Sequence, residues 1–507
     1  MSTDAIVESL RALLPTERRP LVRQRVTLLD TFDGRIRRAG ARLTRSGAGS
    51  AVTIGFRSES APFSVSVSTP PGFVWDLPDG PLRHALLAVA GGRRLVAQAE
   101  VDAQESVLDV RDHRDKTVAR LTVESGRARL PAERARWEPV PSVITLTGLR
   151  GYEDAYTTLL PVIESRPGLG VCPEGFDSAI LRHLGILTTD VPPPGSDLPP
   201  TALAGIGIRQ IHRALRQILV ANEPGVRDAL DTEFLHDYRV AVRRTRSLLK
   251  QIRQVFPAAA VEHFSNEFAW LGRLTGPARD LDVLLFSIRT NQQELQPDDV
   301  EGLAAFLSEA GQREHRRLIE TLDSDRYRQL LAGWETFLLQ PVNLDQDVSN
   351  AGRFLVDVVS PRAWRLSRRI ARGLGAVDDH TPAERLHALR IDAKKLRYLV
   401  DVTPSFYDAA DLERVLGALK KLQRVLGDFN DAQLQEQRLL ALRMALTDDE
   451  ESRRTRNVLE RLATRYRQRS KDLRRRIADG ITRFRSKDTR AACRRAFKRA
   501  TAMERAL

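Results

Sequence analysis

Two stretches of the chain decide its fold: HDYRVAVRRTRSLLK at residues 236–250 and HALRIDAKKLRYLVD at residues 387–401, which begin 151 residues apart. We call the separation of His236 and His387 the repeat offset. The same offset separates two glycines that follow these histidines, Gly276 within LGRLTGPARDLD and Gly427 within LQRVLGDFNDAQ. Two separate matches at one offset indicate a duplicated unit of about 150 residues, a length at which each copy is expected to hold its own core.

Both copies are predicted to be helical. Residues 201–507 are rich in Leu, Arg, Ala and Glu at a spacing of 3.6 residues, which predicts helices. The first repeated helix is expected to begin with Asp231 or Thr232 as its N-cap, and the second with Thr381. The second helix is expected to end near Asp401, because a proline follows soon after.

Each repeated helix carries one histidine and three cations on one face, at positions i, i+3, i+7 and i+10. The first cationic row is His236, Arg239, Arg243 and Arg246, and the second cationic row is His387, Arg390, Lys394 and Arg397. Each row is roughly 15 Å long. Like charges along one face repel one another, so a helix carries them at low cost only where acids pair with them or an anion binds.

Two interpretations of the rows follow. The cations could be balanced by acids such as Asp280 and Asp431, which are matched across the repeat. Alternatively they bind a phosphate polyanion, because Arg forks suit phosphate oxygens, Lys is a point charge and His gains a proton beside an anion. Duplication of the histidine strengthens the second interpretation, since structural pairing does not require it, but both stay open, and a hydrogen-bonding role in the core is the default for the histidines themselves. Arg273 and Arg424 are also matched and are expected to join from neighbouring helices.

Acids near the matched glycines are better explained as caps or arginine partners than as catalytic groups. These acids are Asp280, Asp282, Asp428 and Asp431. No His or Glu recurs beside them at the spacing of metal ligands. The sequence therefore predicts neither catalytic nor metal-binding residues, and no cofactor.

The motif His-x-x-Arg-Val-x-x-Arg-Arg-x-Arg, followed by LGRLTGPARDLD and then by the second copy, resembles the CHAD domain, a conserved histidine α-helical domain. The resemblance covers about residues 201–507. It implies two antiparallel four-helix bundles related by an internal pseudo-two-fold, with halves near 201–350 and 351–507. It also implies binding of inorganic polyphosphate through basic helix surfaces, often at intracellular granules. The predicted polyphosphate-binding residues are His236, Arg239, Arg243, Arg244, Arg246, Arg273, His387, Arg390, Lys394, Lys395, Arg397, Lys421 and Arg424.

Residues 1–185 carry strand signals, short alternating runs separated by Gly and Asp turns. Residues 29–45, LDTFDGRIRRAGARLTR, contain an Asp33-Gly34 turn that a strand should follow, and they resemble CYTH domains. The resemblance implies an antiparallel β-barrel of triphosphate-tunnel type, an α+β domain. A proline-rich linker is predicted at residues 186–200, so the whole chain is expected to be a multidomain α and β protein.

The CYTH-like domain departs from its family where the metal ligands belong. CYTH domains begin with a Glu-x-Glu-x-Lys strand, but Glu8 and Glu17 are the only glutamates within residues 1–29. Thr145 and Thr147 stand where a second carboxylate pair is expected. Divalent cations need several oxygen ligands, so a non-catalytic domain is predicted. The alternative is a metal-dependent triphosphatase or polyphosphatase that uses Mg²⁺ or Mn²⁺.

The formal charge of +14 arises from 80 Lys and Arg against 66 Asp and Glu, and the excess is concentrated in the C-terminal segment 451–507. Apolar residues at helical spacing between Leu459 and Phe484 predict a packed amphipathic helix with a cationic outer side. This segment suggests a third function, binding of a nucleic-acid backbone. Aromatic residues do not interleave with the cations, which argues against reading of single strands.

The remaining expectations concern the cellular setting. Two cysteines, Cys172 and Cys493, exclude a disulfide framework and suit a reducing compartment. No membrane span and no signal peptide are predicted. The protein is therefore expected in the cytoplasm, at polyphosphate granules, with polyphosphate as its partner and nucleic acid as a competitor. The sequence leaves its oligomeric state open.

Overall fold

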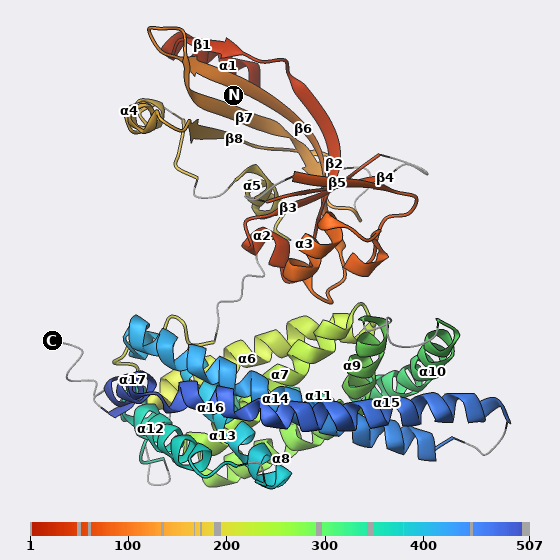
Figure 1. Cartoon of the computed structure of the whole chain (residues 1–507). Coiled ribbons are helices and arrows are strands. Elements are labelled where there is room, and N and C mark those ends of the chain that lie inside the picture. Colours follow the sequence, from red (N-terminus) through yellow and green to blue (C-terminus); the bar gives the residue numbers. More distant parts are fainter. Residues whose placement is uncertain are drawn as a thin grey trace. The chain divides into compact units, whose positions relative to one another are not determined.

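The computed structural model describes residues 3–47, 52–58, 62–132, 136–166, 168–172, 175–186, 194–290, 297–341, 348–378, 380–446 and 450–498. The chain divides into two compact units, residues 1–191 and 192–507 (Figure 1). The predicted linker partly lies outside the described residues, at 187–193. Its boundaries therefore stay a prediction.

The N-terminal unit is built on one antiparallel sheet. Its strands are β1 (Thr16–Arg18), β2 (Val22–Asp30), β3 (Arg42–Ser46), β4 (Val52–Arg57), β5 (Pro62–Val67), β6 (Val96–Arg111), β7 (Thr117–Arg129) and β8 (Glu138–Gly148). The order is β5-β4-β3-β2-β6-β7-β8, and β1 pairs with β6. Within the described residues β5 and β8 do not pair with each other, so the predicted closed barrel is wrong.

Helices pack against both faces of this sheet, so its buried residues lie between sheet and helix and not inside a barrel. They are α1 (Thr3–Leu13), α2 (Arg35–Arg38), η1 (Val74–Asp76), α3 (Pro81–Ala90), α4 (Glu153–Glu164) and α5 (Phe176–His183). On β6, Val101 and Ala103 pack in one core with Phe176 of α5, while Leu108 and Val110 belong to a second core with Val7 of α1. A barrel needs one face of every strand to line a common interior. Side chains alternate between the two faces along a strand, so Val101 and Ala103 of β6 face one core, while Leu108 and Val110 face another on the opposite side of the sheet.

The CYTH-like segment forms a helical turn where a strand was expected. The Asp30 carboxylate accepts hydrogen bonds from the backbone N–H groups of Ile36 (2.9 Å) and Arg37 (3.1 Å). The Thr31 hydroxyl accepts another from Arg35 N–H at 2.9 Å. These bonds satisfy the free donors at the start of α2. The strand, β3, begins only at Arg42.

In the C-terminal unit every named element within the described residues is a helix (Figure 1). Its helices are α6 (Ala204–Arg227), α7 (Thr232–Gln251), α8 (Ala258–Leu274), α9 (Gly276–Thr290), α10 (Pro297–Leu322), α11 (Asp325–Leu339), α12 (Leu355–Leu374), α13 (Ala383–Asp401), η4 (Pro404–Phe406), α14 (Ala409–Met444), α15 (Glu450–Arg475), α16 (Ile477–Arg485) and α17 (Lys487–Lys498). The repeat offset separates the first residues of α6 and α12, of α7 and α13, and of α8 and α14. The duplication seen in the sequence is thus present in the order of helices.

The two copies meet through reciprocal backbone contacts. Leu203 and Phe354, which are matched at the repeat offset, form an isolated antiparallel bridge. Ala204 N–H donates to the carbonyl of Arg353, and Leu355 N–H donates to the carbonyl of Ala202, each at 2.8 Å. Exchanging the copies turns one bond into the other, as a pseudo-two-fold at this point requires. The division of the unit into two four-helix bundles stays a prediction.

One continuous core joins both copies, contrary to the expectation of a core in each. Buried Leu215 and Leu248 of the first copy belong to the same cluster as Leu366 and Leu396 of the second. The packing of α6 on α12 and of α7 on α13 creates this continuity. A smaller core, which includes Leu307, lies between α9, α10, α14 and α15.

The helix caps follow the sequence in one copy only. Asp231 caps α7 as predicted, accepting from the backbone N–H groups of Glu233 and Phe234. In the second copy the Thr381 hydroxyl donates to Asp378 at 2.8 Å and makes no cap to α13. The prediction for Thr381 is therefore wrong, while the predicted end of α13 at Asp401 is confirmed.

The first copy is broken where the second runs straight. α8 ends at Leu274 and α9 starts at Gly276, whereas α14 continues through the matched Gly427. Pro277 follows Gly276, and its ring removes a donor and clashes with the carbonyl four residues earlier. Asp428 stands at the corresponding place and permits a continuous helix. No helix within the described residues has the length and apolarity to cross a bilayer.

Candidate anion-binding site

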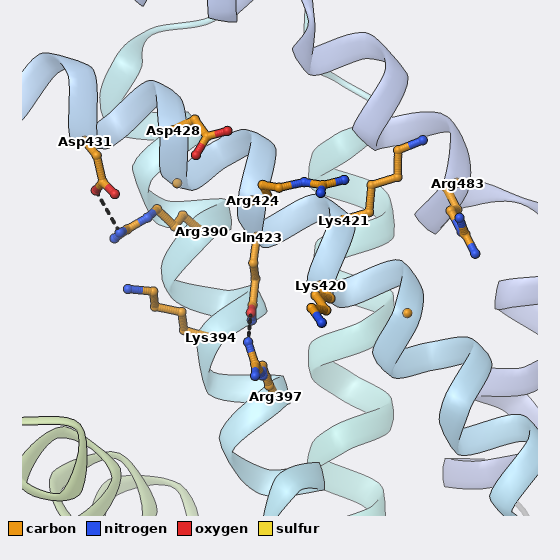
Figure 2. Close-up of a pocket in the computed structure, with 12 residues that line it drawn as sticks. Arg390, Lys394, Arg397, Lys420, Lys421, Gln423, Arg424, Asp428, Asp431 and Arg483 are labelled. Atoms are coloured by element: carbon orange, nitrogen blue, oxygen red, sulfur yellow. Dashed lines mark hydrogen bonds and ion pairs between the residues drawn. The ribbon is translucent and has the colours of Figure 1, made fainter. Parts of the chain in front are cut away.

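A basic pocket of about 510 Å³ lies between α13, α14 and α16 (Figure 2). We call it the α13–α14 pocket. Its cations are Arg390, Lys394, Arg397, Lys420, Lys421, Arg424 and Arg483, and its acids are Asp428 and Asp431. Gln423, Gly417 and Gly427 complete the lining. Seven cations against two acids leave a net positive pocket.

Helix geometry explains why these side chains meet. Arg390, Lys394 and Arg397 share one face of α13, which packs against α14. The matched glycine lies beside the row, since a Cβ on Gly427 would make an ordinary van der Waals contact with Nε of Arg390, at 3.9 Å. In the first copy a Cβ on Gly276 would lie 3.6 Å from Arg239. Each glycine therefore faces the arginine that follows the histidine in its cationic row.

Acids compensate only part of the pocket's charge. Arg390 pairs with Asp431 at 3.2 Å and Arg397 with Asp401 at 3.3 Å. The other cations form no ion pair within 4.0 Å with any residue that the structure describes; they are Lys394, Lys420, Lys421, Arg424 and Arg483. A bound anion would supply the missing negative charge.

Lys394 has the most perturbed charge in the pocket. Burial, together with the charges of the neighbouring cations Arg390 and Arg243, lowers its pKa to about 8. Burial and the like charge of Asp431 raise the pKa of Asp428. Arg243 belongs to the first cationic row, so the two rows come together near Lys394. The basic surface therefore extends from the pocket onto α7.

Arg239, the first-row equivalent of Arg390, has a different task. Its Nη1 donates to the carbonyl of Gly272 at 2.9 Å and to the hydroxyl of Thr275 at 2.7 Å. Both acceptors lie at the end of α8, where the helix leaves carbonyls without partners. Burial and the nearby Arg243 lower the pKa of Arg239 to about 10. Arg239 thus caps the broken helix.

Three further cations of the first copy, Arg243, Arg246 and Arg273, lie along α7 and α8. Burial and the charge of Arg273 lower the pKa of Arg246. Arg243, Arg246 and Arg273 make no ion pair with an acid within the described parts of the chain. Arg244 differs, because it pairs with Asp401 of α13 at 3.1 Å.

The two histidines tie helices together and do not line the pocket. Arg279 of α9 donates to Nδ1 of His236 at 3.3 Å, and Nδ1 of His387 donates to Oδ1 of Asn430 of α14 at 2.6 Å. Arg279 and Asn430 are themselves matched at the repeat offset, so the two contacts correspond. Lys395 also lies outside the pocket and pairs with Asp392 at 3.6 Å.

The pocket therefore gathers five predicted residues and two cations that sequence reasoning missed. The predicted ones are Arg390, Lys394, Arg397, Lys421 and Arg424, and the missed ones are Lys420 and Arg483. Lys420 precedes Lys421, so its place on a basic stretch was a usable signal. Arg483 comes from the basic C-terminal segment, and only the packing of α16 on α14 brings it here.

Much of the C-terminal charge is paired. Asp299 accepts from both Arg454 (3.0 Å) and Arg461 (2.5 Å), and Glu436 accepts from Arg467 (2.7 Å). The predicted apolar stripe is buried, with Leu459 in the smaller core and Phe484 in the main one. The predicted amphipathic packing is confirmed, but the stripe lies on two helices, α15 and α16, and not on one.

Acids of the N-terminal sheet are mostly engaged by arginines. Glu100 pairs with Arg129 at 2.6 Å and Asp102 with Arg127 at 2.9 Å. Burial raises the pKa of Glu124. Within the described residues no group of three or more His, Cys, Asp or Glu side chains is placed to hold a metal ion.

Comparison with known proteins places residues 209–440 in a family. They match the model of the CHAD domain, so the predicted CHAD domain is confirmed over that range. The resemblance of residues 1–185 to CYTH domains stays a prediction.

Two curated relatives are the uncharacterized proteins MT2285 and Rv2226 of Mycobacterium tuberculosis, from strains CDC 1551 and H37Rv. Each is 26% identical over 280 residues, which make up 54% of this chain and 51% of the relative. The match thus spans about half the length of these relatives.

Two solved structures are also similar. The CHAD domain from the plant Ricinus communis has a TM-score of 0.49 and 24% identity, over 57% of this chain and 95% of that one. PptA from Streptomyces chartreusis has a TM-score of 0.41 and 15% identity, over 55% of this chain and 99% of that one.

Proposed function

We propose that the protein binds inorganic polyphosphate, without catalysis, in the α13–α14 pocket and along the adjoining face of α7. One observation carries the proposal: five of the seven pocket cations lack an acid partner within the described residues. Burial of Lys394 among other cations makes the free pocket electrostatically costly. A polyanion would offset that cost, and the convergence of Arg243 on Lys394 offers an elongated ligand a path onto α7.

The lining favours a bare phosphate chain over single-stranded nucleic acid. No aromatic side chain lines the pocket among the residues that the structure describes, so bases would find no stacking surface there. Arginine forks and lysine point charges both suit phosphate oxygens. Recruitment to polyphosphate granules would follow from such binding and belongs to the same proposal.

The test is a titration of the full chain with long-chain polyphosphate at several salt concentrations. The triple variant Lys420→Gln, Lys421→Gln, Arg424→Gln removes three exposed or half-exposed pocket cations that make no ion pair with the described residues. We expect affinity to fall about tenfold or more, since each phosphate contact is a charge-assisted bond. The slope of log K against log salt should shrink by about 2 for the three lost contacts.

The matched control removes the same charge from elsewhere. Arg313, Arg316 and Arg317 are exposed on α10, and replacing all three by Gln should leave the affinity within about twofold. Equal losses in both triple variants would mean that net charge alone attracts the chain and would refute the pocket assignment. Displacement of polyphosphate by duplex DNA at equal phosphate concentration would refute the choice of ligand.

A further inference from the structure

Helix α12 carries a third row of cations with the spacing of the duplicated rows. Arg362, Arg365, Arg369 and Arg372 occupy positions i, i+3, i+7 and i+10. Together with Arg368 and Leu366 they line a hollow of about 390 Å³. We call these five arginines the α12 row.

The first copy shows that the fold does not need these arginines. The positions on α6 that match the four spaced arginines at the repeat offset hold Ile211, Ala214, Ile218 and Ala221. Ile211 is fully buried, whereas Arg362 brings a charge to the matching place on α12. Two arginines that α6 does carry have partners: Arg216 pairs with Glu335 at 2.6 Å, and Arg213 donates to the carbonyl of Leu338 at 2.7 Å. The α12 row is thus an addition specific to the second copy.

Charge on α12 is almost uncompensated. Within the described residues, Asp392 of α13 is the one acid that pairs with the row, through Arg369 at 2.5 Å, and Lys395 shares it. Nε of Arg362 is buried without a hydrogen-bond partner. Burial lowers the pKa of Arg362, as do the charges of Arg369, Arg365 and Arg253. This end of α12 therefore lacks a counter-charge of its own.

The hollow is separate from the α13–α14 pocket. On α13, Asp392 and Lys395 face α12. Arg390 and Lys394 lie about half a turn away around the same helix and face α14. The two hollows share no lining residue. A ligand on the α12 row would therefore leave the first pocket free.

We propose that the α12 row is a second binding site for phosphate chains, so that each molecule holds inorganic polyphosphate at two places. This inference rests on the proposed function and extends it. Five guanidinium forks with one apolar residue between them match phosphate oxygens, and no aromatic side chain lines the hollow among the described residues. A long chain bound at both sites gains avidity, because the second contact is intramolecular.

The experiment is a calorimetric titration of the full chain with tripolyphosphate, which is short enough to occupy one site. The wild-type chain should bind two per molecule. The variant Arg362→Gln, Arg365→Gln, Arg372→Gln spares Arg369, which pairs with Asp392, and should bind one. The pocket variant Lys420→Gln, Lys421→Gln, Arg424→Gln should also bind one, and the combined variant none. The control triple variant on α10 should still bind two.

The outcomes separate this inference from the function on which it rests. One site in the wild type, lost in the pocket variant and kept in the α12 variant, would overturn the second site and leave the proposed function standing. Absence of binding in the wild type would overturn both. If the triple variant on α12 fails to fold, the exposed single changes Arg365→Gln and Arg372→Gln replace it. Each should weaken the second site about threefold or more, and unchanged binding in both would overturn the proposal.

Discussion

At the scale of single residues, Lys394 is the side chain whose charge state the pocket controls. Burial and neighbouring cations bring its pKa to about 8, so it is mostly protonated at pH 7 and mostly neutral at pH 9. A bound polyanion favours the charged form and raises this pKa. Above pH 8, binding must therefore take up a proton, and the affinity must fall as the pH rises.

This coupling gives the first residue-scale prediction. Polyphosphate affinity should weaken above pH 8, approaching tenfold per pH unit for one proton taken up. Lys394→Arg keeps the charge at every accessible pH, so its affinity should stay nearly flat between pH 7 and 9. Calorimetry at pH 7, 8 and 9 measures both proteins. An equal decline in wild type and variant would show that another group controls the pH dependence.

The residues also show how far sequence patterns reach. Periodicity on one helix placed Arg390, Lys394 and Arg397 on a common face, because α-helical spacing is local and fixed. Periodicity could not predict that Arg239 and Arg390 have different contacts, because the residues around them in the sequence are alike. Their roles diverge through tertiary contacts, since Arg239 meets the free carbonyl of Gly272 and Arg390 meets Asp431. Arg483 was missed for the same reason.

At the scale of elements, the break between α8 and α9 makes the two copies unequal. Pro277 follows the break in the first copy, and Arg239 donates to the carbonyl of Gly272 near the end of α8. The unbroken α14 satisfies its own carbonyls at the matching place. Duplicated arginines have thereby acquired different tasks, one in stability and one in the pocket.

Two alanine substitutions test this division. Arg239→Ala removes the guanidinium donor from the carbonyl of Gly272 and from the hydroxyl of Thr275, and should lower the free energy of unfolding by about 1–3 kcal/mol. Arg390→Ala breaks a half-exposed ion pair and should cost less than about 1 kcal/mol, but it should weaken polyphosphate binding several-fold. Urea unfolding and titration of both variants give the two readings. The reverse order of stabilities would contradict the capping role of Arg239.

The strands of the N-terminal sheet were predicted correctly, but the prediction that they close into a barrel was wrong. Alternating runs identify strands, because period two is a local property. Closure depends on whether the strands at the two edges pair, and no local pattern reports that. Val101 and Leu108 of β6 show the reason, since each packs against a helix that is distant in sequence and on a different face.

At the scale of the whole molecule, the region that carries the net positive charge is not the region that holds the proposed binding cations. The excess of +14 lies in the C-terminal segment 451–507, where several arginines already pair with Asp299 and Glu436. The pocket and the α12 row lie mainly in a part of the chain with nearly balanced composition. What distinguishes them is the local lack of acid partners, and this only the packed helices reveal.

The division into two compact units gives the last prediction. Since the pocket, the α7 face and the α12 row all lie within residues 192–507, that unit alone should bind polyphosphate with the affinity and salt slope of the full chain. Residues 1–191 alone should not bind measurably at physiological salt, because Glu100 and Asp102 already engage Arg129 and Arg127. Circular dichroism checks that each unit is folded. A tenfold loss of affinity on removing residues 1–191 from a folded helical unit would show that the N-terminal unit takes part in binding.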